Sequence, residues 1–226
     1  MELIGILAMA LGFGLIHALD ADHLLAVSGL SGMRRDSLSQ GTRFCLRWAV
    51  GHGSSVLLIG SLVVLAGMAI PDTMSGVAEQ LVGLMLLVIG VMLLLDLARQ
   101  KNSLYIHRHD SLPVHVHLEN SKTINPLYKH RHGSVMVGLL HGVAGSAPLL
   151  ALLPVSQAAS PQVAMLYLVV FCLGVLIAML IVGGLLGSLF KVIGHANLKA
   201  VNLFRAVLGL MAVSFGVSWL LLGSTA

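Results

Sequence analysis

Long apolar segments constrain this chain more than any other feature. A helix needs about 20 apolar residues to cross the hydrocarbon layer of a membrane. The chain is 57% hydrophobic and only 10% charged, whereas a soluble domain carries roughly 25% charged residues. Continuous apolar runs favour helices over barrel strands. We therefore expect an all-α integral membrane protein with six transmembrane helices, at about 3–30, 44–70, 77–98, 134–156, 162–190 and 199–223.

The positive charges fall in alternate connections between these segments. Lysines and arginines gather in 31–43, 99–133 and 191–199, while the other connections are acidic or uncharged. Basic loops mark the cytoplasmic side of a membrane protein. We expect a multi-pass protein of the cell membrane, with both termini outside and the 99–133 loop in the cytoplasm. The basic residues then act as topology signals, and no nucleic-acid partner is expected.

The two halves of the chain resemble each other in sequence. Three segments of the first half recur in the second at offsets of 124, 127 and 126 residues, and the longest has seven identities in 14 positions. The matches follow the same order in both halves, which indicates a duplication. The matched pairs are Gly14–His17 with Gly138–His141, Phe44–Leu46 with Phe171–Leu173, and Val82–Leu95 with Leu208–Leu221.

This duplication predicts three units along the chain. Residues 1–98 form a first three-helix repeat, 99–133 a histidine-rich loop and 134–226 a second three-helix repeat. Because three spans are an odd number, the two repeats would have opposite orientations. Inverted repeats are typical of transporters, which bind their substrate near the midplane, where the repeats meet.

Ionisable side chains interrupt three of the apolar segments. A charged side chain at the bilayer centre costs about 2.5–3.5 kcal/mol, so a group of them needs a compensating partner. A divalent cation is such a partner, because imidazole and carboxylate groups bind it. The alternative without metal is a proton relay or a salt-bridged cluster. The candidate ligands are His17, Asp20, Asp22, His23, His52 and His141.

The first of these segments allows two arrangements. In an unbroken helix, with about 100° per residue, His17, Asp20 and His23 share one side and Asp22 points away. A helix that unwinds near 18–22 would instead group Asp22 with the two histidines. No glycine or proline lies between His17 and His23, so both acids stay candidates.

Residues His17–His23 have the pattern H-x4-D-H, and the second helix contains Gly51-His52-Gly53-Ser54-Ser55. With Gly138–Ala147, these segments resemble the nickel/cobalt transporter family, and most closely its short urease-associated permease branch. The resemblance implies transport of Ni²⁺ or Co²⁺ as the substrate, with His17, Asp22 and His23 essential and His52 a further ligand. Longer members have eight helices and an acidic D-T-A-T-E stretch in the second half, which this chain lacks.

The 99–133 loop carries six histidines in three His-x-His pairs. Residues i and i+2 of an extended chain share a face, so each pair would chelate one cation. We expect weak metal buffering, and the alternative is a bare solvated linker. The pairs are His107/His109, His115/His117 and His130/His132.

The membrane potential favours uptake over efflux. A charge that enters a negative interior gains about 2.3 kcal/mol per 100 mV, so a dication gains about 4.6 kcal/mol, or roughly a thousandfold gradient. No P-loop for ATP hydrolysis is present, and efflux through the same site would require proton coupling.

The other function class is an intramembrane His/Asp metalloenzyme or acyltransferase. The depth of the motif and the duplicated halves favour a transporter, so we do not expect an enzyme or an organic cofactor. The expected partners are the metal ion and the bilayer. A metallochaperone and a second copy of the chain are open alternatives.

Overall fold

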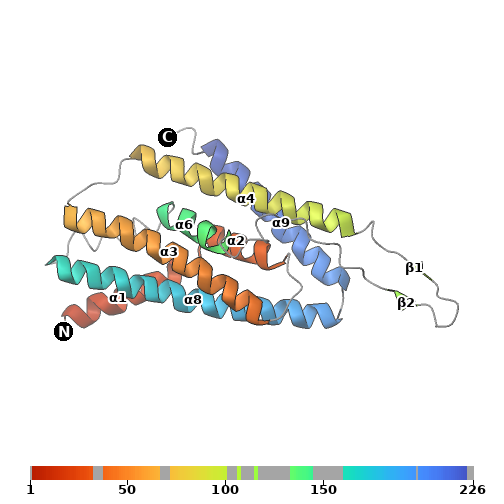
Figure 1. The fold of residues 1–226 in the computed structure, drawn as a ribbon, viewed down its shortest axis with the longest axis horizontal. Helices are drawn as coiled ribbons and strands as arrows, with labels where there is room; N and C mark the ends of the chain where they lie inside the picture. The colour runs from red at the N-terminus through yellow and green to blue at the C-terminus, as the bar shows by residue number, and fades with distance from the viewer. Residues whose placement is uncertain are drawn as a thin grey trace.

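The computed structural model describes residues 2–32, 38–66, 72–100, 106–107, 115–116, 133–144, 160–196 and 198–222. Within these ranges the chain forms seven helices, packed lengthwise into an elongated bundle (Figure 1). Their bounds are α1 (Glu2–His17), α2 (Ala21–Gly32), α3 (Leu38–Ala66), α4 (Asp72–Gln100), α6 (Gly133–Val143), α8 (Pro161–Ala196) and α9 (Leu198–Leu222).

Four of these helices are long and apolar enough to cross a membrane. A fifth crossing results if α1 and α2 form one span, which is bent by 53°. Helix α6 is apolar but shorter than a span, and the rest of the expected fourth span, 145–156, lies outside the described residues. The chain is thus an α-helical membrane protein with four or five candidate spans in its described part. The four long spans are Gly41–Leu65, Glu79–Arg99, Pro161–Leu189 and Lys199–Leu221.

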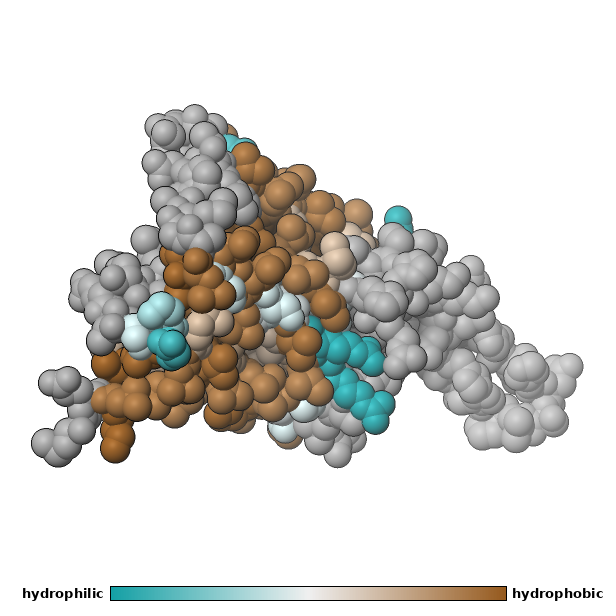
Figure 2. Space-filling view, turned by 60° about the vertical axis from the view of Figure 1, so that its left-hand side comes forward, coloured by the Kyte–Doolittle hydropathy of each residue, from teal (hydrophilic) through white to brown (hydrophobic). Residues whose placement is uncertain are grey.

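Large apolar side chains cover the outside of the bundle. Leu58, Leu65 and Leu185 are each about two-thirds exposed. Figure 2 shows that hydrophobic residues occupy most of the described surface on one face, with hydrophilic residues in a few patches. A soluble monomer does not expose apolar surface on this scale, so the bundle surface is suited to contact with lipid.

Two short strands modify the all-α expectation. β1 (Ile106–His107) and β2 (His115–Val116) pair antiparallel, with His107 opposite His115. Figure 1 places both strands beyond one end of the bundle. The other four loop histidines lie outside the described residues: His109, His117, His130 and His132.

Glycines allow the helices to cross closely at reciprocal places. A Cβ atom at Gly14 of α1 would meet the backbone of α8 beside Gly174, and one at Gly138 of α6 would meet the α3 backbone at Trp48. Gly51 of α3 packs equally closely against the α6 backbone. Gly138 lies 124 residues after Gly14, and Gly174 lies 123 after Gly51. The α1–α8 and α3–α6 crossings are therefore counterparts.

The α4–α9 crossing has the same reciprocity. Gly83 lies close to the backbone of Gly216, and Gly90 lies close to that of Gly209. Gly209 lies 126 residues after Gly83, and Gly216 lies 126 after Gly90, so each contact is the counterpart of the other at the offset of the sequence match between Val82–Leu95 and Leu208–Leu221.

The contacts between α3 and α8 give a different offset from the one that the sequence match of these two helices predicts. Gly183 packs against the Cys45 side chain, and Gly60 packs against Leu168. These contacts are counterparts at an offset of 123 residues, four fewer than the match of Phe44–Leu46 with 171–173 indicates. Four residues make about one helical turn, so the two cysteines do not occupy equivalent places.

Candidate metal centre

The first span breaks in the middle of its polar motif. Helix α1 ends at His17, where the N–H of Leu19 donates to the Ile16 carbonyl (2.9 Å) and the N–H of Asp20 donates to the His17 carbonyl (3.0 Å). Such i→i+3 bonds are typical of helix ends. The Asp20 carbonyl accepts the Leu24 N–H at 3.0 Å, so Asp20 is the N-cap of α2, a position that aspartate favours. Of the two arrangements above, the chain has the broken helix.

Four buried imidazoles meet beside this break. His17 ends α1, His23 lies in the first turn of α2, His52 lies within α3 and His141 near the end of α6, and none is more than 1% exposed. The ring centroid of His23 lies 4.6 Å from His17, 5.1 Å from His52 and 5.2 Å from His141. The cluster therefore joins helices from both halves of the chain.

Each aspartate of the motif holds one imidazole. Asp20 Oδ2 lies 2.9 Å from His17 Nδ1, and Asp22 Oδ1 lies 2.9 Å from His23 Nδ1. Both acids lie at the N-terminal end of α2, where the helix dipole favours negative charge. A carboxylate that accepts a ring N–H fixes the tautomer and makes the other ring nitrogen a better metal ligand.

The ring nitrogens of the cluster that do not contact an aspartate indicate that a ligand binds here. The Nε2 atoms of His23 and His141 and both ring nitrogens of His52 are buried and have no hydrogen-bond partner among the described residues. Nδ1 of His141 donates to the Val137 carbonyl at 2.9 Å. A neutral imidazole that donates through Nδ1 carries its lone pair on Nε2, the atom that binds a metal. Buried polar groups are nearly always paired, so these nitrogens need a partner.

Two sets of donor atoms are close enough to hold an ion. Nitrogens of His17, His23 and His52 lie within 4.8 Å of one another, and so do donor atoms of Asp20, Asp22 and His23. All six candidates from the helical segments thus gather at one place, because the ring of His141 also contacts that of His23.

A family comparison places the chain among known membrane proteins. The sequence pattern of the family described as "Cytochrome C biogenesis protein transmembrane region" matches residues 24–218. The chain belongs to this family. The matched region contains His52 and His141 but starts one residue after His23, so the polar motif of the first span lies outside it.

A curated protein that is similar to this chain has a more specific name than the family has. The urease accessory protein UreH of Bacillus sp. (strain TB-90) is 27% identical over 219 residues, which cover 97% of this chain and 92% of UreH. An accessory protein as a relative agrees with the expectation that the chain is not an enzyme. No solved structure matches the chain.

Two aromatic rings that the sequence analysis did not single out complete the centre. The Trp48 ring stacks on His52 at 5.1 Å with an angle of 10°, and meets His23 edge-on at 5.0 Å. The Phe171 ring stacks on His17 at 5.6 Å. Trp48 lies four residues before His52, and this helical spacing, which places two side chains on one face, was the available signal.

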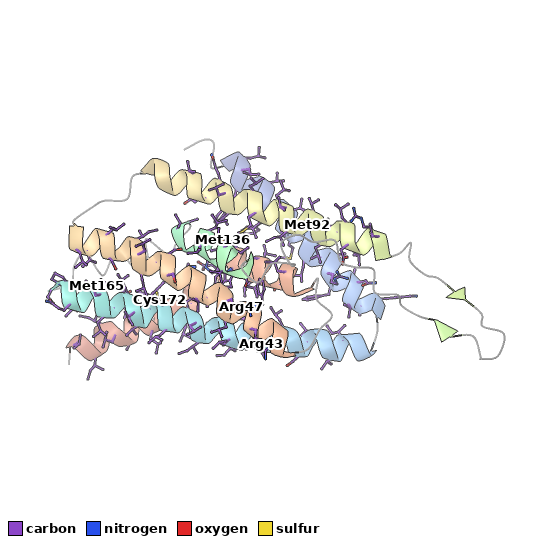
Figure 3. All side chains as sticks on the ribbon, in the orientation of Figure 1. Arg43, Arg47, Met92, Met136, Met165 and Cys172 are labelled. Carbon is purple, nitrogen blue, oxygen red and sulfur yellow. The ribbon has the colours of Figure 1, made fainter. Side chains whose placement is uncertain are left out.

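Two further charged residues of the spans pair with each other. An ion pair of 2.5 Å between Asp96 and Arg205 joins α4 to α9. Both cysteines are free, and Cys172 lies on α8 while Arg43 and Arg47 lie on the first half of α3 (Figure 3). Within the described ranges, the two sets that share His23 are therefore the candidate metal sites.

Proposed function

We propose that this chain carries a divalent transition-metal ion, Ni²⁺ or Co²⁺, across the membrane, and that His17, His23 and His52 bind the ion on its way. The observation that carries the proposal is the group of buried ring nitrogens of His23, His52 and His141, which have no hydrogen-bond partner in the part of the chain that the structure describes. Imidazole suits nickel and related transition metals, whereas Mg²⁺ and Ca²⁺ prefer oxygen ligands. Two adjacent carboxylates offset the charge of a buried dication.

The comparisons support nickel as the ion. UreH is named as an accessory protein of urease, and the H-x4-D-H motif resembles that of nickel/cobalt transporters. Both relationships lead to the urease-associated branch of that family. Ni²⁺ is therefore the first ion to test, with Co²⁺ as the second.

We place the ion path between two inverted halves, residues 1–98 and 134–226. The reciprocal glycine contacts support this arrangement, because each close crossing has a counterpart at an offset of 123, 124 or 126 residues. His17 and His141 lie at counterpart positions, and their helices belong to different halves. A substrate site near the meeting place of the repeats is typical of inverted-repeat transporters.

Uptake is the direction that we propose. The connections rich in lysine and arginine would face the cytoplasm, with both termini outside, and the potential would draw the dication inward. The 99–133 segment would then buffer imported ions weakly, which the pairing of His107 opposite His115 supports. A metallochaperone could collect the ion on that side.

Accumulation of isotopic Ni²⁺ by proteoliposomes tests the proposal. With an inside-negative potential, wild-type protein should load the vesicles and His52→Ala should not, because the ion loses a ligand. His195→Ala removes a histidine of α8 outside the cluster and serves as the matched control, which should transport normally. Equal transport by His52→Ala and wild type would contradict the proposed site, and accumulation only under an inside-positive potential or proton gradient would indicate efflux.

A further inference from the structure

Two donor sets with different chemistry overlap at His23. The inner set consists of His17, His23 and His52, and the outer set of Asp20, Asp22 and His23. The inner set offers three imidazole nitrogens, whereas the outer set offers two carboxylates and one nitrogen. Nitrogen ligands favour Ni²⁺ and Co²⁺ over Mg²⁺ and Mn²⁺, whereas carboxylates bind all of these ions.

The two sets also differ in burial. The histidines of the inner set are at most 1% exposed, while the Asp22 side chain is 8% exposed and that of Asp20 is 35% exposed. A carboxylate within a membrane span faces a water-filled approach rather than lipid, because exposure of its charge to hydrocarbon is costly. Asp20 therefore marks the side from which an ion would reach the cluster.

We propose that the outer set is a separate ion position, which a dication occupies before it moves to the inner set. This inference rests on the proposed transport function and adds an order of binding to it. The outer position binds the partly hydrated ion through oxygen atoms and does not discriminate between metals. The inner position selects Ni²⁺ or Co²⁺ through nitrogen atoms.

The aspartates have a different role in each state. With the ion in the outer position, Asp20 and Asp22 are its ligands. With the ion in the inner position, the same carboxylates accept the Nδ1 protons of His17 and His23, as they do in this structure. This arrangement presents the Nε2 lone pairs of both rings to the ion.

The two positions exclude each other. They share His23 as a ligand, and two dications a few ångströms apart in a low-dielectric interior repel strongly. The two overlapping sets should therefore hold one ion at a time.

Equilibrium binding of Ni²⁺ alone and of Mn²⁺ alone to the purified full chain tests this inference. Wild type should bind one Ni²⁺ per chain tightly and Mn²⁺ weakly. His52→Ala should lower the Ni²⁺ affinity by about 100-fold or more and leave the Mn²⁺ affinity within about twofold of wild type. Adding Asp20→Asn to that variant should lower the remaining Mn²⁺ affinity by about tenfold or more.

Glu79→Gln and His195→Ala are the matched controls outside the cluster, and both should bind as wild type does. His52→Asn and Asp20→Ser replace any variant that does not elute as a folded species. Two tightly bound Ni²⁺ per chain, loss of Mn²⁺ binding in the His52 variant, or a Mn²⁺ affinity that does not change when Asp20 is replaced would each overturn the inference. Normal Ni²⁺ transport together with any of these results would leave the proposed function intact, whereas the expected binding pattern without transport would refute only the function.

Discussion

His17 and His141 occupy counterpart positions in the two halves, 124 residues apart. Each packs against an aromatic ring from a helix of the other half, with centroids 5.6 Å apart for His17 and Phe171 and 5.5 Å apart for His141 and Trp48. Phe171 follows Trp48 by 123 residues, the offset of the glycines at the same crossings. The close glycine crossings and the aromatic contacts of these two histidines thus recur in both halves.

The candidate ligands around the two histidines are present once. His52 corresponds to Val175 at the offset of 123 residues, and His23 corresponds to Ala147 at the offset of 124 residues. Both aspartates of the centre also come from the first half. Helix packing and the candidate metal ligands are therefore separable in this sequence, since the second half has the crossings without the counterparts of His23 and His52.

The largest expected effect tests this difference directly. His17→Ala should lower Ni²⁺ uptake by more than about 100-fold, because it removes a member of the inner set and the partner of Asp20. His141→Ala should lower it by only about tenfold, because that ring supports His23 from outside the inner set. Initial rates of isotopic uptake at a fixed protein content measure both effects.

Equal losses of Ni²⁺ uptake in the two variants would contradict the proposed difference between the halves. His141 would then be as important a ligand as His17. His195→Ala, which leaves all four clustered histidines in place, should retain the wild-type rate. A lower rate in that control would indicate that histidine substitutions impair the protein in general.

The fold could be predicted where apolar length alone decides it. Helices α3, α4, α8 and α9 agree with the expected spans to within a few residues, because a helix must cross a layer of fixed thickness. The gathering of the six polar candidates was also predictable, since ionisable groups avoid lipid. The helix break was not, because 18–20 contain no glycine or proline, although Asp20 and Asp22 have the spacing of an N-cap and first-turn acid.

Other features could not be obtained from the sequence. Phe171 lies in an apolar run, where a ring that packs against an imidazole looks like any other buried aromatic residue. The offset between α3 and α8 was wrong by one turn, because a three-residue identity in an apolar helix arises easily by chance. The expected fourth span, 134–156, has only its first part, α6, within the described residues.

An intermediate effect tests whether the two scaffolds are equivalent. Gly14→Ala and Gly138→Ala each place a methyl group against the backbone of a crossing helix, α8 in the first case and α3 in the second. Each should destabilise the protein by about 1–3 kcal/mol, the usual cost of an overpacked contact. Gly12→Ala, where a Cβ meets nothing within 4 Å, is the matched control in α1. Thermal unfolding in detergent compares the four proteins, and a stable Gly138 variant beside an unstable Gly14 variant would show that the crossings are not counterparts.

The smallest expected effect concerns the aromatic rings. The chain has two tryptophans, and the Trp48 ring lies 5.1 Å from His52, while Trp219 lies on α9. Bound Ni²⁺ should therefore quench the fluorescence of Trp48 and not that of Trp219, so that Trp48→Phe abolishes the quenching. This variant keeps an aromatic ring on His52, and its Ni²⁺ affinity, measured by equilibrium dialysis, should fall by less than about tenfold.

Phe171→Trp in the Trp48→Phe background transfers the probe to the second half, where its counterpart position stacks on His17. Quenching should return, because His17 belongs to the inner set, and an unquenched Trp at 171 would place the ion away from His17 and remove the link between the two halves at the centre.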